Sequence, residues 1–117
     1  MADILVVDDI DLIRHLLHEV LTRMGHNVTL ACNGTEALNL CQAHRFDLII
    51  LDYRMPGMNG LEVAKRLKGK IRFVLHTAEY NNQALKRKAL KAGALGVIAK
   101  VDGLKAFRKD LDKFLNM

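Results

Sequence analysis

The chain has 117 residues, half of them hydrophobic, which suggests one domain with a sizeable core. No apolar run approaches the roughly 18 residues of a membrane span, and the N-terminus lacks the charged and long apolar regions of a signal peptide. The formal net charge of +5 permits a nucleic-acid or acidic partner, but only 5% of the residues are aromatic and none is Trp, which favours a solvated basic surface. We therefore expect a single cytoplasmic domain over residues 1–117, with no direct contact to membrane or nucleic acid.

Short apolar runs with helical patterns between them extend from one end of the chain to the other. The runs that indicate strands are residues 3–8, 28–31, 47–51, 71–76 and 95–99. The first and third runs are almost continuously apolar, as in parallel strands that are covered on both faces. The apolar positions that indicate helices lie within residues 13–24, 37–41, 61–67, 84–92 and 104–114.

The alternation of strands and helices implies a doubly wound α/β domain, in which right-handed crossovers connect parallel strands. Residues suited to helix ends support these boundaries. Gly25 is expected at the end of the first helix, Asn33 at the start of the second and Gly69 after the third. Such domains bind ligands outside the carboxyl ends of the strands, at the point where the strand order switches.

Polar residues stand at the ends of four of the strand-like runs. They are Asp8 and Asp9 after the first run, Asp52 after the third, Thr77 after the fourth and Lys100 after the fifth. Because the carboxyl ends of parallel strands meet at one edge of a sheet, these side chains are predicted to form one site.

The residue types at this edge predict phosphoryl chemistry. Three carboxylates repel each other by roughly 4 kcal/mol per pair at about 4 Å and an effective dielectric constant of about 20, so a cation must offset them. An all-oxygen cluster suits Mg²⁺, which takes one or two carboxylates together with phosphate oxygens. Lys100 adds a fixed positive charge, Thr77 a hydrogen-bond donor, and a carboxylate such as Asp52 can form an acyl phosphate.

Cys32 and Cys41 lack metal-type spacing and are expected to be reduced structural thiols.

Each of these residues also has a simpler explanation. Asp8 and Asp9 could cap the first helix, and Asp52 could be a turn residue. Thr77 could be a loop hydroxyl and Lys100 a solvated lysine. Their occurrence together, in order and at the strand ends of one alternating pattern, favours the shared site.

On these residues the chain resembles the receiver domain of bacterial response regulators, especially the single-domain chemotaxis type, over its whole length. The resemblance is carried by Ile4–Asp9, Leu51–Asp52, Met55–Gly60, Thr77–Ala78 and Ala99–Lys100. It implies a flavodoxin-like sheet with strand order 2-1-3-4-5. It also implies a two-component signalling protein that is phosphorylated itself, and no turnover of an external substrate.

The resemblance further implies roles for individual residues. Asp52 would accept a phosphoryl group from a phosphohistidine on a sensor histidine kinase or a phosphotransfer protein, and Thr77 and Lys100 would contact that group. The implied Mg²⁺ ligands are the side chains of Asp8, Asp9 and Asp52 and the backbone carbonyl of Arg54. Phosphorylation would switch a surface formed by the fourth helix, fifth strand and fifth helix, which binds a downstream protein.

Two positions depart from the family pattern. The family usually has Tyr or Phe three residues before its Lys, with a ring that turns inward, where this chain has Val97, which has no ring to turn. The family usually has Pro after the Lys, often with a cis peptide bond, where this chain has Val101. A non-proline cis bond costs about 2.5–4 kcal/mol, so a trans bond is expected and the loop after Lys100 can differ.

Two other functions compete with a phosphorylated receiver. One is a phosphorylation-independent binding module, which Val97 and Val101 favour. It would use the basic residues of the fourth and fifth helices, although a solvated face is the favoured explanation of those residues. They are Lys86, Arg87, Lys88, Lys91, Lys105, Arg108 and Lys109. The other is an Asp-nucleophile phosphatase of the haloacid dehalogenase type, which Arg54 disfavours because such enzymes have an acid two residues after the nucleophile.

Overall fold

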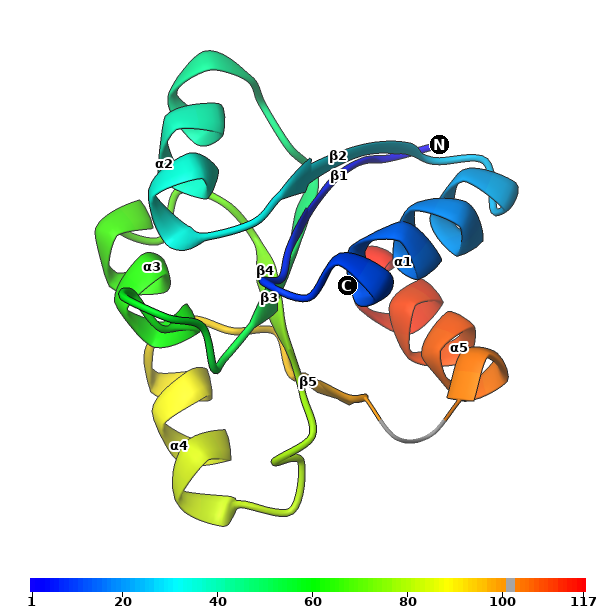
Figure 1. Cartoon of the computed structure of the whole chain (residues 1–117). Coiled ribbons are helices and arrows are strands. Elements are labelled where there is room, and N and C mark those ends of the chain that lie inside the picture. The colour runs from blue at the N-terminus through cyan, green and yellow to red at the C-terminus, as the bar shows by residue number, and fades with distance from the viewer. Residues whose placement is uncertain (101–102) are drawn as a thin grey trace.

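The structure is a computed structural model that describes residues 1–100 and 103–117 (Figure 1). The strands are β1 (Asp3–Val7), β2 (Asn27–Ala31), β3 (Leu48–Asp52), β4 (Phe73–Thr77) and β5 (Val97–Ala99). The helices are α1 (Asp11–Arg23), α2 (Gly34–Ala43), α3 (Gly60–Leu67), α4 (Gln83–Lys91) and α5 (Gly103–Leu115). The predicted alternation of strands and helices is confirmed. Within the described residues, none of the helices has the length and apolar character needed to cross a bilayer.

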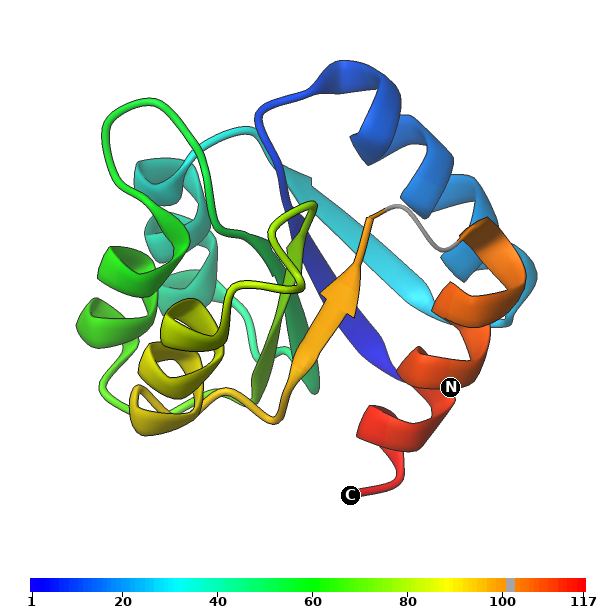
Figure 2. The ribbon, with the colours of Figure 1, turned by 90° about the horizontal axis from the view of Figure 1, so that it is seen from below.

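The five strands form one parallel sheet in the order β2-β1-β3-β4-β5, which confirms the predicted flavodoxin-like fold. Figures 1 and 2 show α1 and α5 on one face of the sheet and α2, α3 and α4 on the other. The chain leaves β1 for β2 and returns to β3 on the other side of β1. The strand order therefore reverses between β1 and β3, and their carboxyl ends, toward the top of Figure 2, border the crevice where such folds bind ligands.

The core consists of two apolar clusters, one on each face of the sheet. Leu5 and Val7 enter the cluster beneath α2, α3 and α4, whereas Ile4 and Val6 enter the cluster beneath α1 and α5. Since successive strand residues face opposite sides, a strand covered on both faces is apolar throughout. All five residues of β3 are buried, and Asp52 is the only polar one among them. Burial of each large aliphatic side chain contributes about 1.5–3 kcal/mol, so this strand is held firmly.

Asp52 and Thr77 are the last residues of β3 and β4 rather than the first residues of the loops that follow. Both residues still take part in the parallel ladder, Asp52 with β4 and Thr77 with β5. Their backbone positions are consequently fixed by the sheet, which limits where their side chains can point.

The fourth and fifth strands begin later than the apolar pattern predicts, at Phe73 and Val97. The apolar residues just before them, Ile71 and Leu95, pack against the two core clusters without belonging to the continuous ladder. Apolar residues mark burial in the core and do not show where strand pairing begins. The predicted strands therefore start earlier than the observed ones.

The predicted helix ends are confirmed, and one further cap secures the loop after Asp52. Gly25 and Gly69 have positive φ angles of 91° and 70° after α1 and α3. The Asn33 side chain accepts a backbone N–H at the start of α2 at 2.8 Å. Asn59 forms a reciprocal capping box at the start of α3, which the sequence prediction did not include.

Gly60, the first residue of α3, lies directly against the end of β3. A Cβ atom at this position would be 2.5 Å from the carbonyl oxygen of Asp52 and 3.1 Å from the Cα atom of Tyr53. The Gly60 N–H donates to the Tyr53 carbonyl at 2.8 Å and closes the intervening loop. The missing side chain therefore allows α3 to approach the backbone that carries Asp52.

We expect Gly60→Ala to lower the free energy of unfolding by about 2–3 kcal/mol, because the backbone atoms that the methyl group meets cannot move aside. Gly57→Ala in the same loop is the matched control, since it has open space but a φ of +80°. Its left-handed backbone alone should cost about 1–2 kcal/mol. Urea denaturation of the variants measures both values, and a smaller loss for Gly60→Ala would contradict the close approach.

Candidate functional site

Three carboxylates come together at the carboxyl edge of the sheet, where β1 and β3 end. Asp8, Asp9 and Asp52 each place one carboxylate oxygen within 4.8 Å of those of the other two. Asp8 and Asp52 are only 1% and 4% exposed, whereas Asp9 is exposed. The structure thus brings these residues together as the strand ends predict, and the all-carboxylate donor set suits a hard divalent cation such as Mg²⁺.

Lys100 provides positive charge within this cluster. Its Nζ lies 3.0 Å from Asp8 Oδ2 and 3.1 Å from Asp52 Oδ1, and its side chain is 16% exposed. The Lys100 N–H donates to the Thr77 carbonyl at 3.1 Å, which fixes the start of the loop after β5. When all three acids are ionised, one ammonium leaves two negative charges unbalanced, and a divalent cation matches that remainder.

The Asp8 side chain does not cap α1, so this simpler explanation of the Asp8–Asp9 pair is wrong. The N-cap of α1 is Ile10, and it makes no side-chain capping bond. Asp8 Oδ1 accepts the Ile10 N–H at 3.0 Å in the bend before the helix, and Arg14 Nη1 donates to the Asp8 carbonyl at 2.7 Å. These bonds hold Asp8 with its other carboxylate oxygen toward Lys100.

The pKa shifts at this site reflect both burial and the charges of the neighbouring groups. Burial, followed by repulsion from Asp8, raises the pKa of Asp52 to about 6, although Lys100 opposes this rise. Burial alone would lower the pKa of Lys100, but its hydrogen bonds and attraction to Asp8 and Asp52 raise it above its usual value. Lys100 is therefore a permanent cation, whereas the raised pKa allows Asp52 to change its charge near neutral pH.

Thr77 lies at the end of β4, and a chain of contacts connects it to Arg54. Thr77 is 2% exposed, and its Oγ1 accepts the Glu79 N–H at 3.1 Å. The Glu79 carboxylate makes a two-pronged ion pair with Arg54, whose Nη2 lies 3.0 Å from Oε1. The sequence predicted no partner for the Arg54 side chain, and no local spacing could have revealed one 25 residues away.

His76 precedes Thr77 and faces the other side of the sheet. It is 6% exposed, and its ring packs against Phe107 of α5 with the ring centroids 5.5 Å apart. Burial and then the nearby Lys100 charge lower the pKa of His76 to about 4, so the imidazole is neutral at neutral pH. This contact joins the strand that ends in Thr77 to α5, and the sequence pattern gave no signal for it.

Of the two departures from the family pattern, Val97 lies within the described residues and Val101 does not. Val97 pairs with Leu75 in the β4–β5 ladder and is half-buried against the cluster beneath α2, α3 and α4. It therefore fills the position without a ring that could turn. Val101 lies outside the described residues, and the predicted trans bond before it stays a prediction.

The fold and the site together define a flavodoxin-like domain with an acidic, lysine-paired site at its switch point. Residues 4–112 match the family model described as the response regulator receiver domain. The chain belongs to this family, and it is a receiver domain of two-component response regulators.

Individual relatives agree with this assignment. Sporulation initiation phosphotransferase F of Bacillus subtilis is 37% identical over 115 residues, which cover 96% of this chain and 92% of that protein. The chemotaxis protein CheY4 of Vibrio cholerae is 32% identical with a TM-score of 0.91, covering 97% of this chain and 98% of that one. The response regulator TrrA of Thermotoga maritima, solved in complex with Mg²⁺-BeF, is 34% identical with a TM-score of 0.84, covering 97% and 99%. Two further relatives, named as transcriptional regulators, are longer, and the chain spans 30% and 26% of them.

The raised pKa of Asp52 predicts that the metal-free protein loses stability as the pH rises. The acid has an ordinary pKa of 3.8 when unfolded and about 6 when folded, so folding favours its protonated form. This contribution to the free energy of unfolding is fully present below the pKa of the unfolded state. It is lost as the pH rises through the pKa of the folded state, and the loss is on the order of 2–3 kcal/mol. Urea unfolding in a chelator, compared with Asp52→Asn, should show this loss as a difference between the two proteins. A difference that does not change with pH would contradict it.

Loss of the Lys100 ammonium should raise the pKa of Asp52 further, because the cation that opposes the rise is removed. Carbon NMR of the Asp52 carboxyl group in Lys100→Gln, titrated in a chelator, measures this directly. Lys105→Gln, on the exposed side of α5, is the matched control and should leave the titration unchanged. An unchanged titration in Lys100→Gln would show that the two groups are not paired in solution.

Proposed function

We propose that this chain is a phosphorylation-dependent switch in which Asp52 accepts a phosphoryl group from a phosphohistidine. The observation that carries the proposal is that one half-buried ammonium, that of Lys100, contacts both Asp8 and Asp52 within a cluster of three carboxylates. Membership in the receiver family supports it, as does the Mg²⁺-BeF complex of the related TrrA. The donor is a sensor histidine kinase or a phosphotransfer protein.

Asp52 acts as the nucleophile in this transfer. One of its carboxylate oxygens bonds to phosphorus while the phosphorus–nitrogen bond of the donor breaks, and the electron pair of that bond stays on the imidazole nitrogen. The side chains of Asp8, Asp9 and Asp52 and the backbone carbonyl of Arg54 would hold Mg²⁺, which would neutralise charge at the phosphoryl oxygens. Lys100 keeps its pair with Asp8 and turns its other contact from Asp52 to a phosphoryl oxygen.

Thr77 senses the product of this reaction. Its hydroxyl accepts the Glu79 N–H and has its own hydrogen to donate to a phosphoryl oxygen. A shift of Thr77 toward that oxygen also pulls on Glu79, which holds Arg54 at the mouth of the site. This connection gives the loops around the site a way to respond although Val97 has no ring.

The output of the switch is a protein-binding surface on α4, β5 and α5 that a downstream target recognises. In this proposal the chain works as one domain over residues 1–117, in the cytoplasm, and turns over no external substrate. The bond between Asp52 and phosphorus is broken again by water or by onward transfer to another histidine.

Two alternatives are weaker on the geometry. A phosphatase of the Asp-nucleophile type needs an acid two residues after Asp52, and Arg54 at that position is a cation that pairs with Glu79. A phosphorylation-independent binding module accounts for Val97, but it gives no reason for a cluster of three carboxylates with a lysine paired to two of them.

Acetyl phosphate and Mg²⁺ should add one phosphoryl group to the intact chain, and peptide mapping should locate it on Asp52. A chelator should abolish the adduct because it removes the charge neutralisation at the phosphoryl oxygens. Asp52→Asn is the control for the acceptor and should give no adduct while keeping the fold.

Three outcomes would contradict the proposal in different ways. A folded protein that takes up no phosphoryl group points to the binding module. Release of phosphate from aryl phosphate esters over many turnovers points to the phosphatase. An adduct that persists in Asp52→Asn identifies another acceptor.

A further inference from the structure

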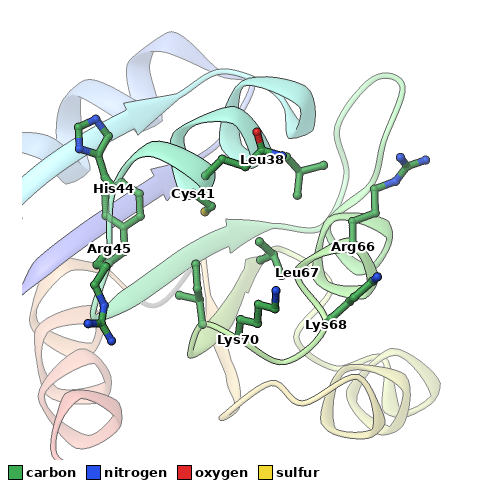
Figure 3. A pocket seen from close by; sticks show the side chains of 11 residues that line it. Leu38, Cys41, His44, Arg45, Arg66, Leu67, Lys68 and Lys70 are labelled. Atoms are coloured by element: carbon green, nitrogen blue, oxygen red, sulfur yellow. The ribbon is translucent and has the colours of Figure 1, made fainter.

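A basic hollow between α2 and α3 lies at the end of the molecule opposite the acidic cluster. It has a volume of about 610 Å³ and is lined by the second half of α2, the end of α3 and the loops that lead into β3 and β4 (Figure 3). The acidic cluster lies where the strands end, whereas this hollow lies where β3 and β4 begin. The proposed phosphoryl chemistry therefore does not involve this hollow.

The floor of the hollow is apolar and incompletely covered. Figure 3 shows Leu38 and Cys41 on the α2 side and Leu67 on the α3 side, and Phe46 and Ile71 complete the apolar lining. All five pack at the border of the core cluster beneath α2, α3 and α4, yet Leu67 alone among them is buried. Burial also raises the pKa of the Cys41 thiol, which is therefore an uncharged part of the floor. Covering such a surface removes apolar area from water and is favourable.

The rim of the hollow is cationic. Arg45, Arg66, Lys68 and Lys70 are exposed, and within the described ranges none of them pairs with a carboxylate. Among the described residues that line the hollow there is no Asp or Glu. In Figure 3, Arg45 and Arg66 stand at opposite ends of the hollow. A positive potential over an apolar floor follows from this arrangement.

Compensation of helix dipoles explains only part of the rim. Cations are favourable at a helix C-terminus, and this accounts for Arg66 and Lys68 at the end of α3. Arg45 and Lys70 lie in connecting loops, and the last turn of α2 carries no basic residue. Lys68 is also the one described residue other than glycine with a positive φ, at 54°, a conformation that glycine adopts without strain.

We infer that this hollow binds a small organic anion with an apolar, ring-sized body. Its volume falls within the range of about 300–1,000 Å³ that is typical of small-molecule sites. The apolar body would cover Leu38, Cys41 and Leu67 while the anionic group faces the cationic rim. An inorganic anion would leave the floor exposed to water, and a neutral aromatic compound would leave the cations unmatched. The binding requires neither Asp52 nor Mg²⁺.

Naphthalene-2-sulfonate on the full chain is the probe, and amide NMR locates its binding. We expect shifts to concentrate in residues 38–46 and 66–71. Naphthalene-2-sulfonamide, which has nearly the same shape without the charge, should bind at least about fivefold more weakly. Equal affinity for the two compounds, or shifts scattered over the basic residues of α4 and α5, would overturn the inference.

Lys68→Gly separates binding from stability, because it removes a rim cation and relieves the left-handed backbone. We expect about fivefold weaker binding of the sulfonate with an unfolding midpoint that is unchanged or higher. Lys109→Gln removes an equal charge from α5, away from the hollow, and should change the affinity by less than about twofold. Equal effects of the two substitutions would mean that only the net charge matters, which contradicts a built site.

Cys41 provides a second measurement at the floor. In a Cys32→Ser background Cys41 is the single thiol, and bound sulfonate should slow its reaction with a maleimide. Asp52→Asn should bind the sulfonate as tightly as the unaltered chain does, which keeps this result separate from the phosphorylation test. Unslowed reaction of Cys41 would contradict binding at the floor. A peptide rich in Glu and Leu that binds the same residues more tightly than the sulfonate would assign the hollow to a protein segment instead.

Discussion

One ammonium group holds together an edge of the sheet that three carboxylates would otherwise push apart. β1 and β5 are separated by two strands, yet the Lys100 side chain after β5 reaches the acid at the end of β1 as well as the acid at the end of β3. Both acids are buried, so removing this cation would be destabilising because it leaves their charge without compensation. The charge at this edge therefore constrains the loops after three of the five strands.

The fold explains why the charge collects at that edge. A sheet covered on both faces leaves no room for polar side chains within its central strands, and β3 is buried along its whole length. Ionisable groups can then reach a shared crevice only at the strand ends. Asp52, as the last ladder residue of β3, is both held by the sheet and open to the crevice, while Gly60 lets α3 close behind it.

The sequence reveals those parts of the structure that depend on local patterns. Apolar periodicity predicts the strands and helices, and polar residues at strand ends predict the neighbours of Asp52. Contacts between distant residues leave no such pattern, as the pairs Arg54–Glu79 and His76–Phe107 demonstrate. The capping box of Asn59 was predictable in principle, since Glu62 stands three residues later. The helix-cap explanation of Asp8 is wrong because the chain bends at Asp9 and places Ile10 at the N-cap of α1, and side-chain type alone does not encode that bend.

The shortness of β5 has a consequence for motion. This strand has three residues and lies at the edge of the sheet, where it pairs with β4 alone. An edge strand of this length can detach by breaking few ladder hydrogen bonds and withdrawing Ile98 from the cluster beneath α1 and α5. We therefore expect its amides to exchange sooner than those of the central strands. Because Lys100 follows β5 directly, such a local opening would withdraw its ammonium from two acids in a single event. Local opening of β5, rather than unfolding of the whole domain, would then set how often Asp8 and Asp52 are without the Lys100 ammonium.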